Sequence, residues 1–151
     1  MSHWCSADAG RIMHPMKAAL LGIALLPAAA FAQQATDNAP LNGTWSWTQP
    51  DSDCTEIYDF RPDGNAYVIS GAERTEARYT LSPKPGPQGR QRLVITATKY
   101  HAGKDCAGRS EDATGKPATS YVLFLPGRRQ LIMCNDETSD ACFGPLFKVN
   151  P

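Results

Sequence analysis

Eight short segments, each alternating in polarity or rich in apolar residues and each bounded by turn residues, constrain the fold of this chain more than any other feature. Within most of these segments apolar and polar side chains alternate with a period of two, as in half-buried β-strands. No segment shows sustained helical periodicity. The sequence therefore predicts an all-β chain. The eight predicted strands are 44–48, 54–60, 66–70, 76–81, 92–98, 120–125, 130–134 and 142–149.

The connections between these segments are mostly short, which favours antiparallel neighbours. Asp63-Gly64 is a strong hairpin signal, and the segment 83–89, rich in Pro and Gly, is expected to be a loop. Only 99–118 is a long connection, of the kind that usually carries a function or a covalent staple. Eight such strands can close into a barrel, which removes exposed sheet edges. We therefore expect a small eight-strand antiparallel up-and-down barrel.

The N-terminal region has the pattern of a secretory signal peptide. Lys17 precedes an apolar run at 18–26, and Ala30-Phe31-Ala32 forms an A-x-A cleavage pattern. We interpret 16–32 as a signal peptide cleaved after Ala32, and 1–15 as the product of a start codon assigned too far upstream. The apolar run is short for a membrane span. The remainder divides into a flexible lead-in, 33–40, and a barrel domain, 41–151, expected in the periplasm or outside a bacterial cell.

Four cysteines follow the predicted cleavage point: Cys54, Cys106, Cys134 and Cys142. An even number in an exported chain indicates two disulfides, for which three pairings are possible. We favour Cys134–Cys142, which closes a polar hairpin tip, and Cys54–Cys106, which fastens the long connection to the sheet. A zinc site is the alternative, but the spacing lacks a C-x₂-C pair and a nearby histidine. No metal and no cofactor are expected.

Composition and residue spacing argue against two broad classes of function. The chain carries 15 Lys and Arg and 15 Asp and Glu, so no excess of basic side chains points to a nucleic-acid partner. His101 is the only histidine after Ala32, and no nucleophile elbow is present. The paired acids at 51/53, 111/112 and 136–140 fall in polar, turn-like stretches. We therefore expect a protein that is not an enzyme.

Gly43-Thr44-Trp45, at the entry to the first of the eight predicted strands, resembles the G-x-W motif of the lipocalin and avidin-like (calycin) barrels. The resemblance implies that Trp45 packs across one end of the barrel and that Gly43 permits a close approach of the chain. It also implies that a basic residue late in the chain packs on the tryptophan by a cation–π contact. Lys148 is the nearest match, where arginine is more usual in the family.

Aromatic side chains supply the candidate binding residues. Trp47 shares a face with Trp45, one step further along the strand, and Tyr58, Tyr79 and Tyr121 lie on other predicted strands. These side chains could form an ordinary packed core, or they could line a pocket, since small-molecule sites are usually apolar and aromatic. The main hypothesis is a non-catalytic barrel that binds a small apolar or amphipathic ligand.

The alternative hypothesis is a periplasmic module that binds a protein and inhibits a hydrolase such as lysozyme. Some exported lysozyme inhibitors are small eight-strand barrels that insert a loop carrying serine, glycine and tyrosine into the active site of the enzyme. Ser70-Gly71, at the end of a predicted strand, is similar to that pattern, but the next tyrosine, Tyr79, is spaced too far from Ser70-Gly71 to complete it.

Overall fold

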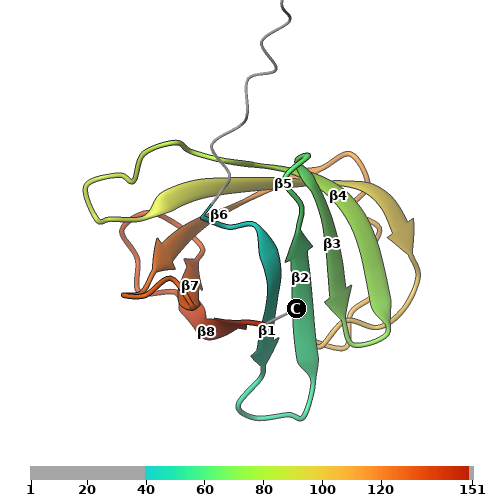
Figure 1. Cartoon of the computed structure of the whole chain (residues 1–151). Helices are drawn as coiled ribbons and strands as arrows, with labels where there is room; N and C mark the ends of the chain where they lie inside the picture. Colours follow the sequence, from blue (N-terminus) through green and yellow to red (C-terminus); the bar gives the residue numbers. More distant parts are fainter. Residues whose placement is uncertain (1–39, 150–151) are drawn as a thin grey trace, which may run out of the picture. The chain divides into compact units, whose positions relative to one another are not determined.

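The computed structural model describes residues 40–149 and contains eight β-strands, as the sequence predicts (Figure 1). Every predicted segment corresponds to one strand, with ends that differ by a few residues. The strands are β1 (Gly43–Thr48), β2 (Thr55–Phe60), β3 (Asn65–Ser70), β4 (Glu73–Leu81), β5 (Gln91–His101), β6 (Pro117–Phe124), β7 (Gln130–Cys134) and β8 (Cys142–Lys148).

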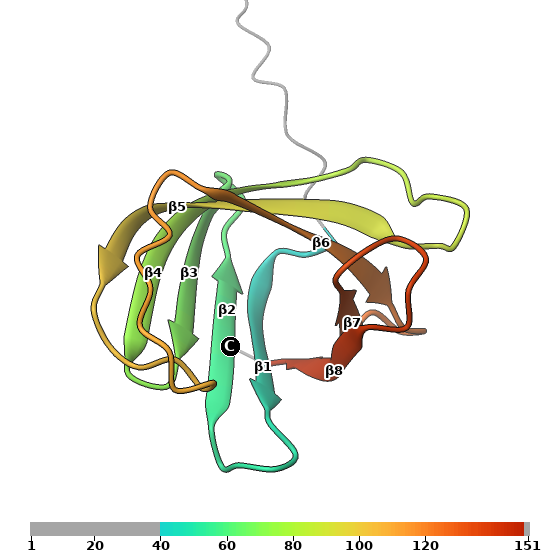
Figure 2. The ribbon, with the colours of Figure 1, turned by 180° about the vertical axis from the view of Figure 1, so that it is seen from behind.

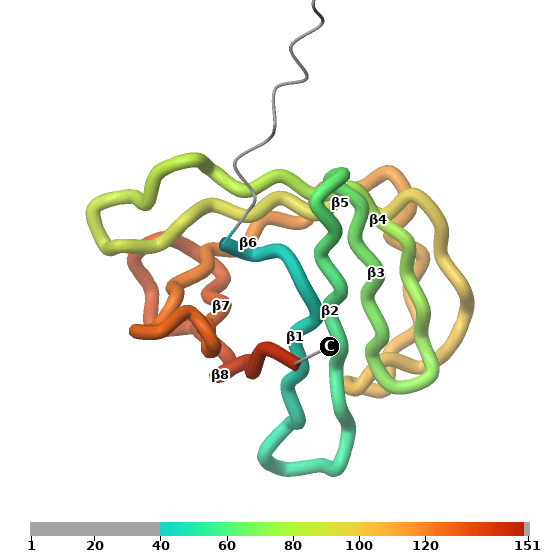
Figure 3. The backbone as a smooth tube through the Cα atoms, viewed as in Figure 1, coloured from blue at the N-terminus to red at the C-terminus, as the bar shows by residue number. Residues whose placement is uncertain are grey.

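The strands form a closed antiparallel barrel in which each strand pairs with its neighbours in sequence and β1 pairs with β8. The closing register places Trp45 opposite Lys148 and Ser46 opposite Phe147. Figure 2 shows the same ring of strands from behind, and the trace in Figure 3 shows β8 returning beside β1. The up-and-down barrel predicted from the sequence is therefore confirmed.

The alternation of polarity places one face of each strand in the barrel interior. On β4, Ala77, Tyr79 and Leu81 are buried, whereas the intervening Arg78 and Thr80 are exposed. The same period continues around the ring because cross-strand partners share a face. The twelve buried residues of the main apolar cluster are Leu41, Trp45, Phe60, Ala66, Ala77, Tyr79, Leu81, Leu93, Val122, Leu131, Met133 and Leu146.

The fifth strand is longer than the sequence predicts. It continues to His101, and β6 begins at Pro117, so the long connection is 102–116 and not 99–118. The added residues are polar, and a register shift between Glu76 and Ala77 lets them pair with the first half of β4. Such pairing needs no apolar face, which is why the alternation pattern missed it. His101, expected in the loop, is the last residue of β5.

Both favoured disulfides are present. Cys54–Cys106 joins the segment before β2 to the 102–116 loop, with a Cα–Cα distance of 5.6 Å. Cys134–Cys142 joins the end of β7 to the start of β8. Within 40–149 the structure has no helix that is long and apolar enough to cross a membrane.

Candidate functional site

Trp45 fills one end of the barrel. Its side chain is fully buried, and the indole Nε1–H donates a 2.7 Å hydrogen bond to the carbonyl oxygen of Leu41, in the segment before β1. The Lys148 Nζ lies 5.2 Å from the centroid of the indole. Gly43 has a φ of +117°, and a Cβ there would lie 2.9 Å from the Lys148 Cε, so no larger residue fits without displacing the lysine. We call this the Trp45 end.

A cavity of about 300 Å³ opens elsewhere in the barrel, on the face covered by the 102–116 loop. Side chains from every strand between β2 and β8 contribute to it. Its wall is mainly apolar and carries a small number of polar groups, which is the usual composition of a small-molecule site. The lining residues are Tyr58, Val68, Glu73, Thr75, Ile95, Ala97, Ala113, Lys116, Ala118, Ser120, Met133 and Phe143.

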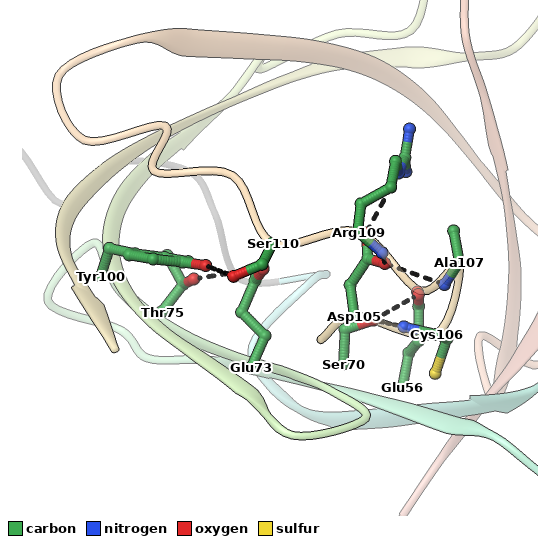
Figure 4. Close-up of polar contacts among 10 residues, drawn as sticks. All are labelled: Glu56, Ser70, Glu73, Thr75, Tyr100, Asp105, Cys106, Ala107, Arg109 and Ser110. Atoms are coloured by element: carbon green, nitrogen blue, oxygen red, sulfur yellow. Dashed lines mark hydrogen bonds and ion pairs between the residues drawn. The ribbon is translucent and has the colours of Figure 1, made fainter. Parts of the chain in front are cut away.

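The 102–116 loop is fastened to the barrel at the β3–β4 turn. Besides the Cys54–Cys106 bridge, the amide of Cys106 donates a 3.0 Å hydrogen bond to Ser70 Oγ, and the amide of Ala72 donates a 2.9 Å bond to the carbonyl of Lys104. The backbones approach closely, because a Cβ on Gly71 would lie 2.8 Å from the Lys104 oxygen. The first part of the loop is therefore held directly over the strand ends (Figure 4).

Polar contacts along the rest of the loop fix its course. Asp105 Oδ1 accepts hydrogen bonds from the amides of Ala107 and Arg109, at 2.9 and 2.7 Å. The Tyr100 hydroxyl lies 2.9 Å from Ser110 Oγ, a contact visible in Figure 4. Further on, the amide of Gly115 donates a 2.9 Å bond to the carbonyl of Ala97. Ala113 and Lys116, which line the cavity, are thus positioned by a loop anchored at both ends.

A hydrogen-bonded group lies between the loop anchor and the cavity. Tyr58 Oη donates a 2.6 Å hydrogen bond to Glu56 Oε2, and Ser70 Oγ donates a 2.9 Å bond to Glu56 Oε1. Burial, together with the charge and hydrogen bond of Glu56, raises the pKa of the Tyr58 phenol well above its usual value. Tyr58 therefore remains a neutral hydrogen-bond donor at physiological pH.

The structure brings only part of the predicted aromatic set to the cavity. Tyr58 lines it, and Trp47 packs against Phe143, a lining residue, with ring centroids 4.9 Å apart. Tyr79 lies in the apolar core, where its hydroxyl donates to Asn42 Oδ1 and to the Arg61 carbonyl. Tyr121 alternates with the inward-facing Val122, on the outer face of β6.

Sequence reasoning missed the polar lining residues Glu73, Thr75 and Lys116. Glu73 stands beside a turn and Lys116 in a long polar connection, where charges are usually solvated. Their place in the cavity depends on the covering loop and on the extra length of β4 and β5. No pattern along the chain would have singled them out.

The other groups that could have a catalytic or metal-binding role lie away from the cavity. His101 Nε2 is 3.3 Å from Glu76 Oε1, but both side chains lie on the outer face of the barrel. Within residues 40–149 no three His, Cys, Asp or Glu side chains are placed to hold a metal ion. A larger depression, of about 580 Å³, is bordered mainly by residues of the 83–89 and 125–128 loops, most of them Pro or Gly. Arg128 is the one charged residue among the described residues that border it, so convergent polar groups are not found there.

Comparison of the chain with protein-family models, with curated proteins and with solved structures finds no match.

Proposed function

We propose that this chain is a non-catalytic, lipocalin-like barrel that binds one small apolar or amphipathic ligand in the 300 Å³ cavity. The observation that carries the proposal is the cavity itself, which draws on β2 to β8 and is covered by an anchored loop. Its volume lies at the lower end of the range for ligand pockets, which restricts the ligand to a small molecule.

The arrangement at the Trp45 end supports the lipocalin-like assignment. Gly43, Trp45 and Lys148 stand in the relation that the G-x-W resemblance implies, with the tryptophan buried and the lysine over its ring. A barrel whose interior is filled at one end and hollow towards the other provides a binding site that is closed at the filled end.

Ligand binding is tested with a neutral fluorescent probe, N-phenyl-1-naphthylamine, and a matched pair of variants. Ala118→Trp places a large ring on the cavity wall, whereas Thr119→Trp places the same ring on the outer face of the same strand. We expect Ala118→Trp to abolish most of the probe fluorescence and Thr119→Trp to preserve it. Equal binding by the two variants would show that the probe does not enter the cavity. Native mass spectrometry of protein from its own envelope would then identify the natural ligand.

Export forms the second part of the proposal. The predicted signal peptide, 16–32, lies outside the described residues, and its cleavage after Ala32 would leave a mature chain that begins at Gln33. Both disulfides favour an oxidising compartment. N-terminal sequencing of periplasmic or secreted protein should read Gln33, and a sequence that begins at Met1 or Met16 would contradict cleavage.

The inhibitor alternative has less geometric support. An inhibitory loop must project into an enzyme's active site, but Ser70 is only 7% exposed and is bonded to Glu56 and to the amide of Cys106. Gly71 lies against the 102–116 loop. The ligand-binding hypothesis therefore stands ahead of inhibition through Ser70-Gly71.

A further inference from the structure

Among the described residues that line the cavity, Glu73 is the one with an acidic side chain. It begins β4 opposite Ser70, on the inward-facing side, and Figure 4 shows it directed towards the loop segment that carries Ser110. From the described part of the chain its carboxylate accepts a single hydrogen bond, from Thr75 Oγ1, at the long distance of 3.4 Å. A carboxylate can accept about four hydrogen bonds, so most of its capacity is unused by the protein.

No cation of the described chain is paired with Glu73. The ion pairs among residues 40–149 involve Asp59, Glu76, Asp105 and Glu111 as the acids. Partial burial is the main cause that raises the pKa of Glu73, and the charges of Asp105 and Glu56 also raise it, whereas the hydrogen bond from Thr75 and the more distant charge of Arg109 lower it. The Glu73 carboxylate therefore has no ion-pair partner in direct contact among residues 40–149.

The neighbouring charges are already engaged. Glu56 accepts hydrogen bonds from Tyr58 and Ser70, and the Asp105 carboxylate accepts hydrogen bonds from loop amides and pairs with Arg109. Lys116 also lines the cavity, but 69% of its side chain is exposed and its Nζ lies 3.7 Å from Glu111. A positive group that enters the cavity would therefore find Glu73 as its unpaired partner.

We propose that the cavity selects a small amine, whose apolar body packs against Ile95, Met133 and Phe143 and whose ammonium group donates hydrogen bonds to the Glu73 carboxylate. This inference rests on the proposed ligand-binding function and specifies the ligand class. An ammonium at this position would give the carboxylate the charged partner that residues 40–149 do not supply, and charge-assisted hydrogen bonds are stronger than neutral ones. The same carboxylate would disfavour an anionic ligand.

The test compares three probes of nearly equal shape: 2-phenylethylamine, 2-phenylethanol and 3-phenylpropionate. Isothermal titration calorimetry on the disulfide-bonded protein should show that the amine binds about tenfold or more tightly than the alcohol, because both can donate a hydrogen bond to the carboxylate but only the ammonium brings an opposite charge. The carboxylate probe should bind most weakly. Equal affinities for amine and alcohol would overturn the inference.

Two substitutions on β4 test whether the preference for the amine probe over the alcohol depends on Glu73. Glu73→Gln removes the charge at nearly constant volume and should reduce amine binding to the level of the alcohol, with alcohol binding unchanged. Glu76→Gln, on the outer face of the same strand, should leave both affinities unchanged. An amine preference that survives in Glu73→Gln would refute the role of Glu73. Failure of all three probes to bind, in a protein that also excludes N-phenyl-1-naphthylamine, would instead reject the proposed function together with the inference.

Discussion

Trp45 and Trp47 stand two residues apart on one face of β1, but their surroundings differ. Trp45 is fully buried, bonded to Leu41 and 6.2 Å from the ring of Phe124, whereas Trp47 is only partly buried and packs on Phe143. We predict that Trp45→Ala lowers the free energy of unfolding by roughly 3–5 kcal/mol, as truncation of large core aromatics does. Trp47→Ala should cost less, because it enlarges a region that already contains a cavity.

Denaturant unfolding of both variants measures this difference. A greater loss of unfolding free energy for Trp47→Ala would mean that Trp47 is an ordinary core residue. The ligand-binding hypothesis would then be weakened.

Tyr79 gives a prediction about alkaline stability. Burial, with the charges of Asp63 and Asp59, raises the pKa of its phenol to about 12. A group whose pKa is raised on folding favours the native state below its unfolded value, near 10, and this contribution is lost as the pH rises towards 12. We expect unfolding free energy to fall between pH 10 and pH 12.

Tyr79→Phe removes the ionisable group and also the hydrogen bonds to Asn42 and the Arg61 carbonyl. It should be less stable than the wild type at pH 8 but should lose less stability between pH 10 and pH 12. Parallel stability curves for the two proteins over that range would contradict the assignment.

At the scale of elements, the position of the 102–116 loop depends on close backbone contact with the β3–β4 turn. Gly71 and Gly108 both have positive φ, at +56° and +76°, so alanine is strained at either position. Only at Gly71 does a Cβ meet another segment, because Gly108 has nothing within 4 Å. We predict that Gly71→Ala destabilises the protein more than Gly108→Ala does, and that it alone increases proteolysis within the loop. Equal destabilisation and equal proteolysis in the two variants would show that backbone strain at positive φ, and not the contact between the loop and the β3–β4 turn, causes the effect.

The two disulfides should also contribute unequally. Cys54 and Cys106 are separated by 52 residues, and Cys134 and Cys142 by 8. Chain-entropy arguments give about 4 kcal/mol for the longer closure and about 2.5 kcal/mol for the shorter. Replacing the first pair by alanine should therefore lower the melting temperature more than replacing the second. A larger effect of the Cys134–Cys142 replacement would indicate that native contacts in the β7–β8 hairpin outweigh chain entropy.

At the scale of the whole molecule, the fold follows from local pattern, whereas the cavity does not. Alternation within β4 and the Asp63-Gly64 turn identify strands and hairpins from neighbouring residues alone, and eight such strands lead naturally to a closed barrel. The cavity wall combines Glu73, Lys116 and Phe143, which are far apart in sequence. Their meeting depends on barrel curvature and on where a covering loop comes to rest, and neither is encoded in a periodic pattern.

The contrast between the filled Trp45 end and the loop-covered cavity predicts uneven local stability. The main apolar cluster includes Trp45 on β1 and Leu131 on β7, both fully buried, so amides in those strands should exchange hydrogen only through global unfolding. The amides of Cys106 and Gly115 are bonded in the exposed loop, to Ser70 Oγ and to the Ala97 carbonyl. They should exchange through local opening, on the order of tenfold faster or more.

A ligand in the cavity should slow hydrogen exchange at the amide of Gly115, next to the lining residue Lys116, and leave exchange in β1 unchanged. Native-state hydrogen exchange measures both effects. If the loop amides exchanged as slowly as those of β7, the loop would open only when the whole barrel unfolds. A ligand would then have no separate route into the cavity.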